Sequence, residues 1–439
     1  MINSEPEIKV ALLQNYNEAH IALNGRFFLT EGRAIDGQFT VRADNGLVGL
    51  IDSSGTEIFR QKEILLSAAQ RSSFTVFDVK IGIDFHWQRK QEQSFRGNLF
   101  LSAVSDSSFD LINEISLEDY LESVISSEMS AEAPLEFLKV QAVVARSWLV
   151  AMLAKKKSSR FLSGLKTENE IVVWQDVNDH IRFDVCADDH CQRYQGITRI
   201  ISTNVHEAID GTRGLFLVYA GEICDARYYK SCGGQTEIFS TAWEDRSPDY
   251  LKSVTDYVEQ HSYIQSEAQA ESWLTGRPLA YCNTMDKELL GRILPAFDQE
   301  TLDFYRWQII YKRQELEEII RKKSGIDFGT LQNLIPLERG PSGRIFKLKI
   351  EGSQRTVIVG KELEIRRWLS SSHLLSSAFV VSKTNAADGS VESFTLTGGG
   401  WGHGVGLCQI GAAVMATKGF KVKEILAHYF TGAQLKKLY

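Results

Sequence analysis

The sequence predicts an α+β fold, and three features of its hydrophobic pattern support this prediction. Segments within residues 1–112 alternate apolar and polar side chains or are rich in β-branched and aromatic residues, as strands are. Residues 113–157 change to the helical period. Strand-like segments return at 344–350 and 356–359, where a short turn would close a β-hairpin. We therefore expect a β-rich N-terminal region, a core in which a helix hairpin packs on antiparallel strands, and an insertion of mixed structure.

The N-terminal region is predicted to be a small antiparallel accessory domain. Its clearest strand candidates are Gln38–Ala43, Gly46–Ile51 and Phe74–Phe85. Glycine, asparagine, aspartate and serine residues separate these candidates, as expected for turns.

The segment 113–157 is predicted to form two helices. The apolar stripe of the first follows the spacing i, i+3, i+4, i+7, i+8 and consists of Leu117, Tyr120, Leu121, Val124 and Ile125. Pro134 suits the first position of the second helix. The inner face of that helix is predicted to contain Leu138, Gln141, Ala142, Ala145, Leu149 and Met152.

The rest of the chain gives weaker signals. Residues 165–250 are predicted to form short strands and ordered loops, and residues 255–335 a helical stretch without a chemical signature. The C-terminal segment 398–439 is predicted to be a glycine-rich loop followed by two short helices, which Gly419 separates.

Composition excludes several classes of protein. The 49 basic and 56 acidic residues give a net charge of −7, which is unlike a general nucleic-acid binder. Hydrophobic residues make up 43% of the chain, enough for a buried core. No stretch approaches about 18 uncharged apolar residues, so we expect no membrane span, and the N-terminus shows no pattern of a secretory signal. Six cysteines are too few for a disulfide-built scaffold.

Glu128 is the most informative single residue. Counted from Leu117, the apolar stripe predicts another inward position at i+11, and a carboxylate occupies it. Burial raises the pKa of a carboxyl group, which is how a glutamate becomes a general acid near neutral pH. The alternative is that the helix ends near Ser127 and that Glu128 points to solvent.

Arg146 raises a similar question on the second helix. It neighbours Ala142, Leu149 and Val150, so its guanidinium would need a carboxylate or a ligand anion as partner. The alternative is that its long side chain reaches solvent.

A candidate metal site lies at His180, Cys186, His190 and Cys191. Thiolate and imidazole ligands suit zinc, and twelve residues are enough to surround one ion. We expect zinc bound by His180, Cys186 and Cys191, with the fourth position open or filled by His190, and with a structural role. The alternatives are a Cys186–Cys191 disulfide or two buried thiols.

The glycine-rich run at residues 398–412 is a candidate ligand-binding loop. It contains seven glycines, fits no dinucleotide fingerprint, and displays Trp401 and His403 ahead of a helix. A tryptophan beside open backbone is a plausible platform for a sugar, and a tightly packed turn is the alternative. Cys232, just before Gly233 and Gly234, is a further candidate nucleophile with His403 as its base.

Four segments resemble the SpoIID/LytB family, which comprises stage II sporulation protein D and the amidase-enhancer proteins. They are ISLEDYLESVISSEMSAEAPLEFLKVQAVVARSW (115–148), FDVCADDHCQRYQG (183–196), YYKSCGGQTEIFSTAW (228–243) and GGGWGHGVGLCQIGAAVMATKGF (398–420). They occur in the order of the family pattern, and the chain looks like the long-form members of Bacteroidetes-type bacteria. On this resemblance the chain divides into an N-terminal domain (1–112), a core in two parts (113–254 and 395–439) and an insertion (255–394).

The resemblance implies cleavage of peptidoglycan glycan strands. Glu128 matches the glutamate that acts as acid and base in the sporulation members. The residues expected to bind substrate are Arg146, Gly233, Gly234, Thr236, Trp401, His403 and Gln409. Some sporulation members are associated with zinc through a His-x5-Cys-x5-Cys pattern, and here Cys191 comes one residue early. Cys232 and Cys408 are two further departures from the family pattern.

Two functions follow from the resemblance. One is a lytic transglycosylase that cleaves between MurNAc and GlcNAc with a single glutamate and leaves 1,6-anhydro-MurNAc ends. The other is a non-catalytic, wall-binding enhancer of an N-acetylmuramoyl-L-alanine amidase. Either one implies glycan strands as partners in the cell envelope or periplasm, and the enhancer function also implies a cell-wall amidase as partner. We also expect Glu128 to be largely buried and to face one cleft with Trp401 and His403.

Overall fold

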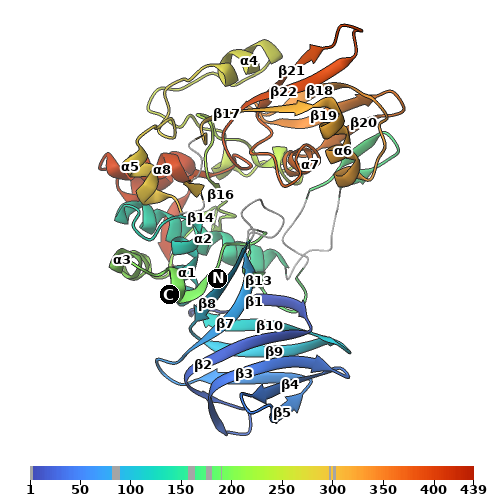
Figure 1. Cartoon of the computed structure of the whole chain (residues 1–439). Coiled ribbons are helices and arrows are strands. Elements are labelled where there is room, and N and C mark those ends of the chain that lie inside the picture. The colour runs from blue at the N-terminus through green and yellow to red at the C-terminus, as the bar shows by residue number, and fades with distance from the viewer. Residues whose placement is uncertain are drawn as a thin grey trace. The chain divides into compact units, whose positions relative to one another are not determined.

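The computed structural model describes residues 3–81, 89–156, 164–174, 180–188, 190–295, 298–299 and 303–439 (Figure 1). The chain forms two compact units. Unit 1 contains Met1–Leu153, Val177–Leu215 and Lys437–Tyr439. Unit 2 contains Ala154–Asp176 and Phe216–Lys436.

Helices and strands are both abundant, which confirms the predicted α+β class. The α-helices of the described residues are α1 (Leu117–Glu128), α2 (Leu135–Lys156), α3 (Thr203–Thr212), α4 (Glu267–Thr275), α5 (Lys287–Ile293), α6 (Arg313–Ser324), α7 (Glu362–Trp368), α8 (Gln409–Thr417) and α9 (Val422–Tyr429). The strands of the N-terminal region are β1 (Glu7–Tyr16), β2 (Glu18–Phe28), β3 (Ala34–Asp44), β4 (Leu47–Asp52), β5 (Glu57–Gln61), β6 (Glu63–Ala68), β7 (Ser73–Ile81), β8 (Arg89–Phe95), β9 (Asn98–Ser105) and β10 (Ser108–Ser116). The later strands are β11 (Leu165–Lys166), β12 (Glu170–Val172), β13 (Val185–Cys186), β14 (Leu215–Tyr219), β15 (Glu222–Ile223), β16 (Tyr228–Tyr229), β17 (Arg306–Lys312), β18 (Leu331–Arg339), β19 (Ile345–Gly352), β20 (Thr356–Gly360), β21 (Phe379–Asn385), β22 (Val391–Gly399), β23 (Leu407–Cys408) and β24 (Gln434–Lys437).

The sheet of unit 1 contains all ten N-terminal strands. Its main path runs β13-β1-β10-β9-β6-β2-β3-β4-β5, and β7 pairs with β2 and β8. The strands alternate buried and exposed residues, as a sheet with one covered face does. The strand β13 is added parallel to β1, with Val10 opposite Val185 and Ala11 opposite Cys186. This pairing fixes the backbone of Cys186 at the edge of the sheet.

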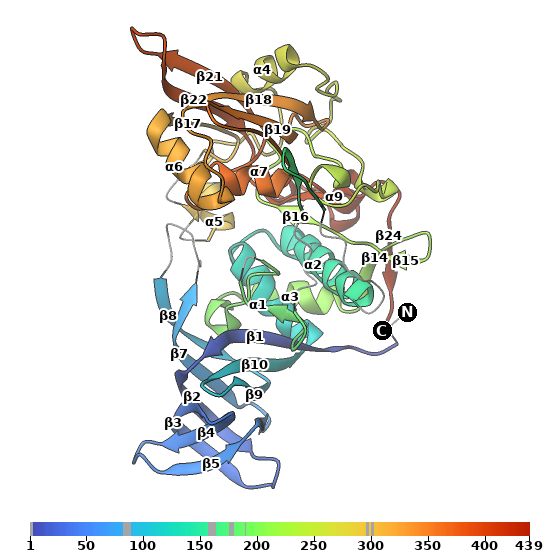
Figure 2. The same cartoon turned by 90° about the vertical axis from the view of Figure 1, so that its right-hand side faces the viewer.

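Helices α1, α2 and α3 complete unit 1, next to strands β1 and β10 (Figure 2). Ser116 caps α1 by accepting a hydrogen bond from the Asp119 backbone, and α1 ends at Glu128. The predicted stripe is confirmed, since Leu117, Tyr120, Leu121, Val124 and Ile125 are all fully buried. The second helix begins next to Pro134, as predicted.

Helix α2 is the most apolar helix of the hairpin. Within the described residues, Leu135–Lys155 is the one stretch long and apolar enough to cross a membrane, with a mean hydropathy of 1.5. The fold buries 78% of its most apolar window, which is what a helix in a protein core shows.

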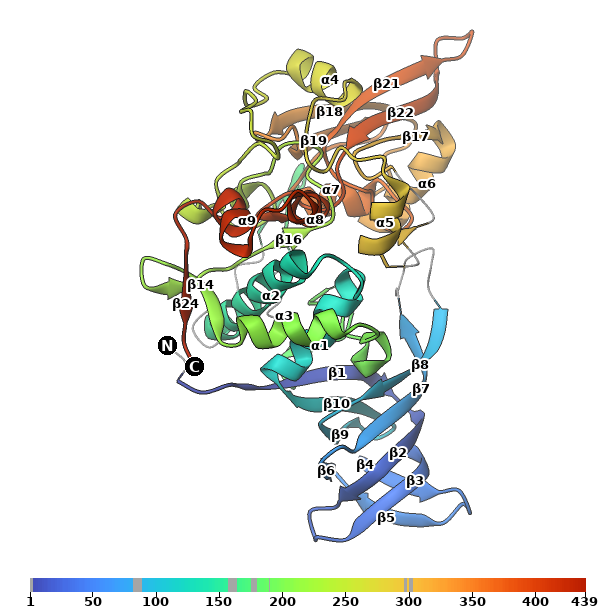
Figure 3. The same ribbon diagram turned by 90° about the vertical axis from the view of Figure 1, so that its left-hand side faces the viewer.

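Unit 2 is built from smaller sheets (Figure 3). One sheet has the order β11-β12-β20-β19-β18, and another has the order β17-β22-β21. The predicted hairpin is confirmed, because β19 and β20 pair antiparallel. Helices α6 and α7 contribute Leu316, Ile320 and Ile365 to the same apolar core as these strands. The two C-terminal helices α8 and α9 flank Gly419 as predicted.

The structure differs from the sequence prediction in two segments. Residues 203–212, predicted as strands and loops, form helix α3, whose buried residues are only Val205, Ala208, Ile209 and Thr212. So short a stripe is a weak signal. The predicted helical stretch 255–335 also contains strands β17 and β18, and part of the predicted strand Phe74–Phe85 lies outside the described residues. The compact units cut across the predicted segments 1–112, 113–254, 255–394 and 395–439, and that division stays a prediction.

Candidate functional site

Glu128 is the last residue of α1 and is partly rather than fully buried. Its Oε1 atom accepts a hydrogen bond of 2.9 Å from the backbone N–H of Arg193. This contact joins the end of α1 to the loop that follows His190 and Cys191. The loop therefore fixes where the Glu128 carboxylate points.

Further hydrogen bonds attach the same loop to the helix hairpin. The Tyr120 hydroxyl donates to Gln192, whose side-chain amide donates to the Ala145 carbonyl of α2. The backbone N–H of Gln195 donates to the Ser123 hydroxyl of α1. Contacts at residues 192, 193 and 195 therefore leave the loop little freedom relative to Glu128.

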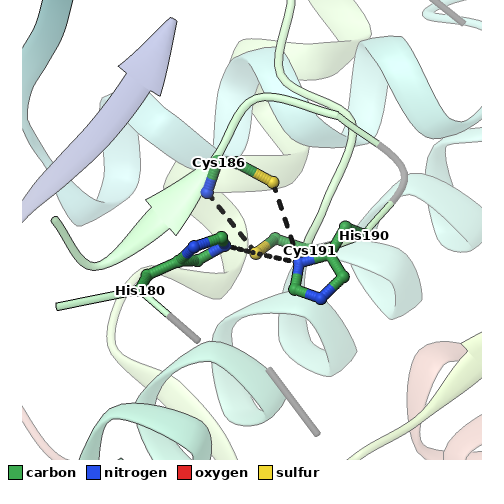
Figure 4. Close-up of side chains that lie close together, drawn as sticks. All are labelled: His180, Cys186, His190 and Cys191. Carbon is green, nitrogen blue, oxygen red and sulfur yellow. Dashed lines mark hydrogen bonds between the residues drawn. The ribbon is translucent and has the colours of Figure 1, made fainter. Parts of the chain in front are cut away.

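The four residues of the predicted metal site lie together in unit 1 (Figure 4). Their ligand atoms all lie within 4.8 Å of one another. The Nε2 atom of His180 is 3.2 Å from the Cys191 sulfur, and the Nδ1 atom of His190 is 3.6 Å from the same sulfur. Cys186 is buried, His180 and Cys191 are partly buried, and His190 is exposed. Two sulfurs and two imidazole nitrogens at this spacing form a donor set that can hold a metal ion such as zinc.

Hydrogen bonds around Cys186 favour its thiolate form. Cys186 is part of a small apolar cluster with Ala11, Ile112 and Phe183, against which Cys191 packs. The backbone N–H of Cys186 points at the Cys191 sulfur at 3.4 Å. The side-chain hydrogen bond with Cys191 is the largest cause that lowers the pKa of Cys186, and His180 and His190 add to it. No disulfide joins these two cysteines in the structure.

Arg146 is fully buried and forms an ion pair within unit 1. Its Nε and Nη2 atoms donate to the two carboxylate oxygens of Glu118 at 3.0 and 2.5 Å, and its Nη1 atom donates to the Leu215 carbonyl. The Tyr439 hydroxyl and the Gly214 backbone donate to the same carboxylate. The sequence predicted a carboxylate or a ligand anion as partner. The pairing with Glu118 favours a structural role over contact with substrate.

The other predicted site residues come together in unit 2, where two distant segments meet. Strand β16 pairs parallel with β23, with Tyr228 opposite Leu407 and Tyr229 opposite Cys408. Isolated bridges join Ser231 to Trp401 and Glu237 to Val405. The two resemblance segments 228–243 and 398–420 therefore lie side by side.

Most of these residues are packed into the fold. Thr236 is 1% exposed and Gln409 is 2% exposed. A Cβ atom at Gly233, where φ is +76°, would lie 2.9 Å from the Gly400 nitrogen. Only glycine therefore fits where these two segments of the backbone approach each other. Trp401 is partly buried, and its ring lies 4.9 Å from that of Phe304. Of the predicted substrate contacts in unit 2, Trp401 and His403 keep partial exposure, while Thr236 and Gln409 do not.

His403 is held by the backbone on both sides of its ring. Its Nδ1 atom accepts from the Val405 N–H at 3.1 Å, so the Nε2–H donates to the Tyr228 carbonyl at 3.1 Å. This is the neutral ring. Burial is the largest cause that lowers the pKa of His403 well below its usual value, and Arg227 and Arg344 add to it. With both nitrogens engaged, and with Cys232 2% exposed, the alternative of a Cys232–His403 nucleophile pair loses its support.

The neutral His403 predicts a pH dependence of stability. Because its pKa is lowered in the folded state, the unfolded chain binds a proton at a higher pH than the folded chain does. Its contribution is therefore complete above about pH 6.5 and decreases as the pH falls below that value, by at most about 1.4 kcal/mol per pH unit. We expect His403→Gln to flatten the decrease in the free energy of unfolding between about pH 6.5 and pH 5, measured by guanidinium denaturation. Burial also lowers the pKa of His428. Part of the pH dependence of the free energy of unfolding should therefore remain in His403→Gln.

The matched control is Tyr229→Phe. The Tyr229 ring contacts that of His403, and its hydroxyl has no hydrogen-bond partner among the residues that the structure describes. This change alters the same pocket without removing a group that titrates in this range, so it keeps the wild-type slope. An unchanged slope in His403→Gln would contradict the prediction.

Sequence reasoning missed two residues of unit 2. Asp256 and Cys282, in a stretch predicted to have no chemical signature, lie beside Cys232 and Cys408. The four residues of this group are far apart in the sequence, so their spacing does not indicate that they lie together. The backbone contact of Arg193 with Glu128 was missed for the same reason.

Comparison with known proteins supports the resemblance. Residues 105–219 match a family model described as Stage II sporulation protein, and residues 237–406 match a domain of unknown function, DUF8618. Stage II sporulation protein D of Bacillus amyloliquefaciens is 25% identical over 328 residues, covering 74% of this chain and 76% of the relative. An amidase enhancer of Bacillus subtilis is 25% identical over 328 residues, covering 72% of this chain but 40% of the relative. An uncharacterised protein of Brachyspira hyodysenteriae is 26% identical over 341 residues, covering 78% of this chain and 72% of the relative.

Residues 105–219 are therefore similar to the SpoIID family, in agreement with the resemblance of the four sequence segments, and a second segment is matched separately. The named relatives, at about 25% identity, support the same resemblance.

Proposed function

We propose that this protein acts on the cell wall as a peptidoglycan lytic transglycosylase, with Glu128 as its single acid and base. The observation that carries the proposal is the position of Glu128 at the end of α1, partly buried and oriented by the Arg193 backbone. The names of its relatives, a sporulation protein and an amidase enhancer, agree with a role at the cell wall. Glycan strands are the proposed substrate, and the cell envelope or periplasm is the proposed location.

The chemistry requires two proton transfers at Glu128. The protonated Glu128 donates its proton to the glycosidic oxygen as the bond between MurNAc and GlcNAc breaks and positive charge develops at the MurNAc anomeric carbon. The Glu128 carboxylate then accepts the proton of the MurNAc C6 hydroxyl as that oxygen bonds to the anomeric carbon. The products are a 1,6-anhydro-MurNAc end and a free GlcNAc end, and no water is consumed.

The other glutamates of α1 have structural partners. Glu118 pairs with Arg146, and Glu122 contacts Arg96 at 3.2 Å and His206 at 2.5 Å. Both carboxylates are therefore held in ion pairs. A hydrolase normally uses two carboxylates, whereas ring closure by the sugar's own hydroxyl needs one. This arrangement supports transglycosylation rather than hydrolysis.

We further propose that His180, Cys186 and Cys191 bind zinc, with His190 or an open position as the fourth ligand. The metal would supply a structural cross-link. The last proposed ligand, Cys191, is two residues before Arg193. A bound metal would therefore fix this loop and keep the Arg193 N–H in place to donate to Glu128. The predicted cleft shared by Glu128, Trp401 and His403 stays a prediction.

Loss of this metal is expected to weaken activity without abolishing it. We expect Cys191→Ser to remove about one equivalent of zinc and to lower the rate of glycan cleavage about 10- to 100-fold, as changes around a metal site commonly do. Elemental analysis and a product assay on the same preparation measure both effects. Cys224→Ser is the matched control, because Cys224 is a buried cysteine outside this group. Unchanged zinc content in Cys191→Ser would contradict this site.

The amidase-enhancer relative supports a second candidate, a non-catalytic protein that binds the wall and stimulates an amidase. Purified glycan strands with and without stem peptides separate the two functions. A transglycosylase releases anhydro-MurNAc ends from at least one of these substrates in the absence of any amidase. An enhancer binds the strands, releases no such ends, and increases the release of stem peptides only when an amidase is present.

A further inference from the structure

The described part of unit 2 contains a second group of metal-ligating side chains: Cys232, Asp256, Cys282 and Cys408. All four residues are buried, and their ligand atoms lie within 4.8 Å of one another. The sulfurs of Cys232 and Cys282 are 3.4 Å apart. The four residues come from four separate segments, so the fold rather than a local motif brings them together.

The spacing suits a single ion. In a tetrahedral zinc site the Zn–S distance of about 2.3 Å places two sulfur ligands about 3.8 Å apart. The Cys232–Cys282 separation of 3.4 Å is close to that value and all four ligand atoms lie within 4.8 Å of one another, so small side-chain rotations would complete the geometry. A disulfide between Cys232 and Cys282 would need the sulfurs to approach to about 2.05 Å and would leave Cys408 and Asp256 buried beside it.

The hydrogen bonds around the group are directed at its ligand atoms. Backbone N–H groups of Gly234 and Cys232 point at the sulfurs of Cys232 and Cys408, each at 3.3 Å. Donors of this kind hold metal-bound thiolates in place. The Cys408 sulfur also lies at the start of α8, where the positive end of the helix dipole favours a negative ligand.

Asp256 is oriented in the same way. The Cys282 backbone N–H donates to its Oδ2 atom at 2.8 Å, and the Tyr429 hydroxyl donates to its Oδ1 atom at 2.5 Å. A Cβ atom at Gly411 would clash with this carboxylate. The absence of a side chain at Gly411 therefore leaves the space in which Asp256 packs against α8. A buried carboxylate beside three buried thiols is costly unless a cation pairs with them.

The geometry points to a second, structural metal site, in which Cys232, Cys282, Cys408 and Asp256 bind one zinc ion. Four protein ligands in a fully buried position leave no open coordination position, which is the mark of a structural site. Cys232 and Cys408 are two of the positions at which this chain departs from the family pattern. The ion would join the loop that carries Gly233 and the start of α8 to the residues 256–282. The inference does not depend on glycan cleavage.

Metal stoichiometry and cobalt spectra of the full chain test this site separately from the one in unit 1. In Cys186→Ser/Cys191→Ser, which lacks the unit 1 thiols, we expect about one equivalent of zinc to remain. Cobalt bound in its place should give the thiolate charge-transfer bands and the strong visible bands of a tetrahedral site. This variant leaves the buried ligands of unit 2 intact, so the readout does not require a disruptive change there. We expect Cys282→Ser/Cys408→Ser to lose one equivalent relative to wild type, and Cys224→Ser to lose none.

Three results would overturn the inference. The first is no bound metal and no thiolate–cobalt band in folded Cys186→Ser/Cys191→Ser. The second is wild-type stoichiometry in Cys282→Ser/Cys408→Ser. The third is a Cys232–Cys282 disulfide in a non-reducing peptide map of the freshly purified wild-type protein.

Discussion

Glu128→Gln should lower the rate of glycan-strand cleavage by about 10²- to 10⁴-fold, because an amide can neither donate the proton to the glycosidic oxygen nor accept one from the C6 hydroxyl. The change keeps the size of the side chain and its ability to accept the Arg193 N–H at the end of α1. We therefore expect wild-type stability and wild-type binding to insoluble peptidoglycan. Chromatography of the released muropeptides measures the rate.

Glu132→Gln is the matched control for this prediction. Glu132 is exposed, lies just after α1 and carries the same charge, so its loss reproduces any general electrostatic effect. We expect nearly wild-type activity from it. Equal activity of Glu128→Gln and wild type would remove Glu128 from the mechanism and favour the enhancer function.

Arg146→Met should be the most destabilising single change in unit 1, by about 3–5 kcal/mol in the free energy of unfolding. The guanidinium is fully buried, and Glu118 is 3% exposed, so the change leaves a carboxylate without its cation inside the fold. Guanidinium denaturation measures the loss. The physical cause is the desolvated charge of Glu118 rather than the lost contact itself.

The double variant Glu118→Gln/Arg146→Met tests that cause. A neutral amide at position 118 removes the buried charge, so the double variant should recover a large part of the loss. Arg42→Met is the surface control, since Arg42 and its partner Glu18 are 56% and 39% exposed, and we expect a change below about 1 kcal/mol. A double variant less stable than Arg146→Met would contradict this account.

The helix hairpin could be predicted because its information is local. The stripe from Leu117 to Ile125 repeats at the helical period, and counting along it predicts an inward position at Glu128, which the structure has partly buried as the last residue of α1. The metal group at His180 to Cys191 was also visible from spacing within twelve residues. The link between its loop and Glu128 was not, since that link is a backbone contact of Arg193 with a residue 65 positions earlier.

The contacts that sequence reasoning missed are long-range. Nothing near Arg146 identifies Glu118, 28 residues earlier, as its partner. Cys232 and Cys408 are 176 residues apart, and Asp256 and Cys282 lie in a stretch with no recognisable pattern. The burial of Thr236 and Gln409 likewise depends on how β16 and β23 pair. One sequence carries no direct signal for such pairings.

The most direct test of the central claim is cleavage of purified glycan strands in ¹⁸O-labelled water, followed by mass spectrometry of the new MurNAc ends. A transglycosylase that uses Glu128 alone predicts anhydro-MurNAc ends that are one water molecule lighter than hydrolysis products and contain no ¹⁸O. It also predicts that Glu128→Gln produces almost none of them. New reducing MurNAc ends that carry ¹⁸O would show hydrolysis and contradict the account.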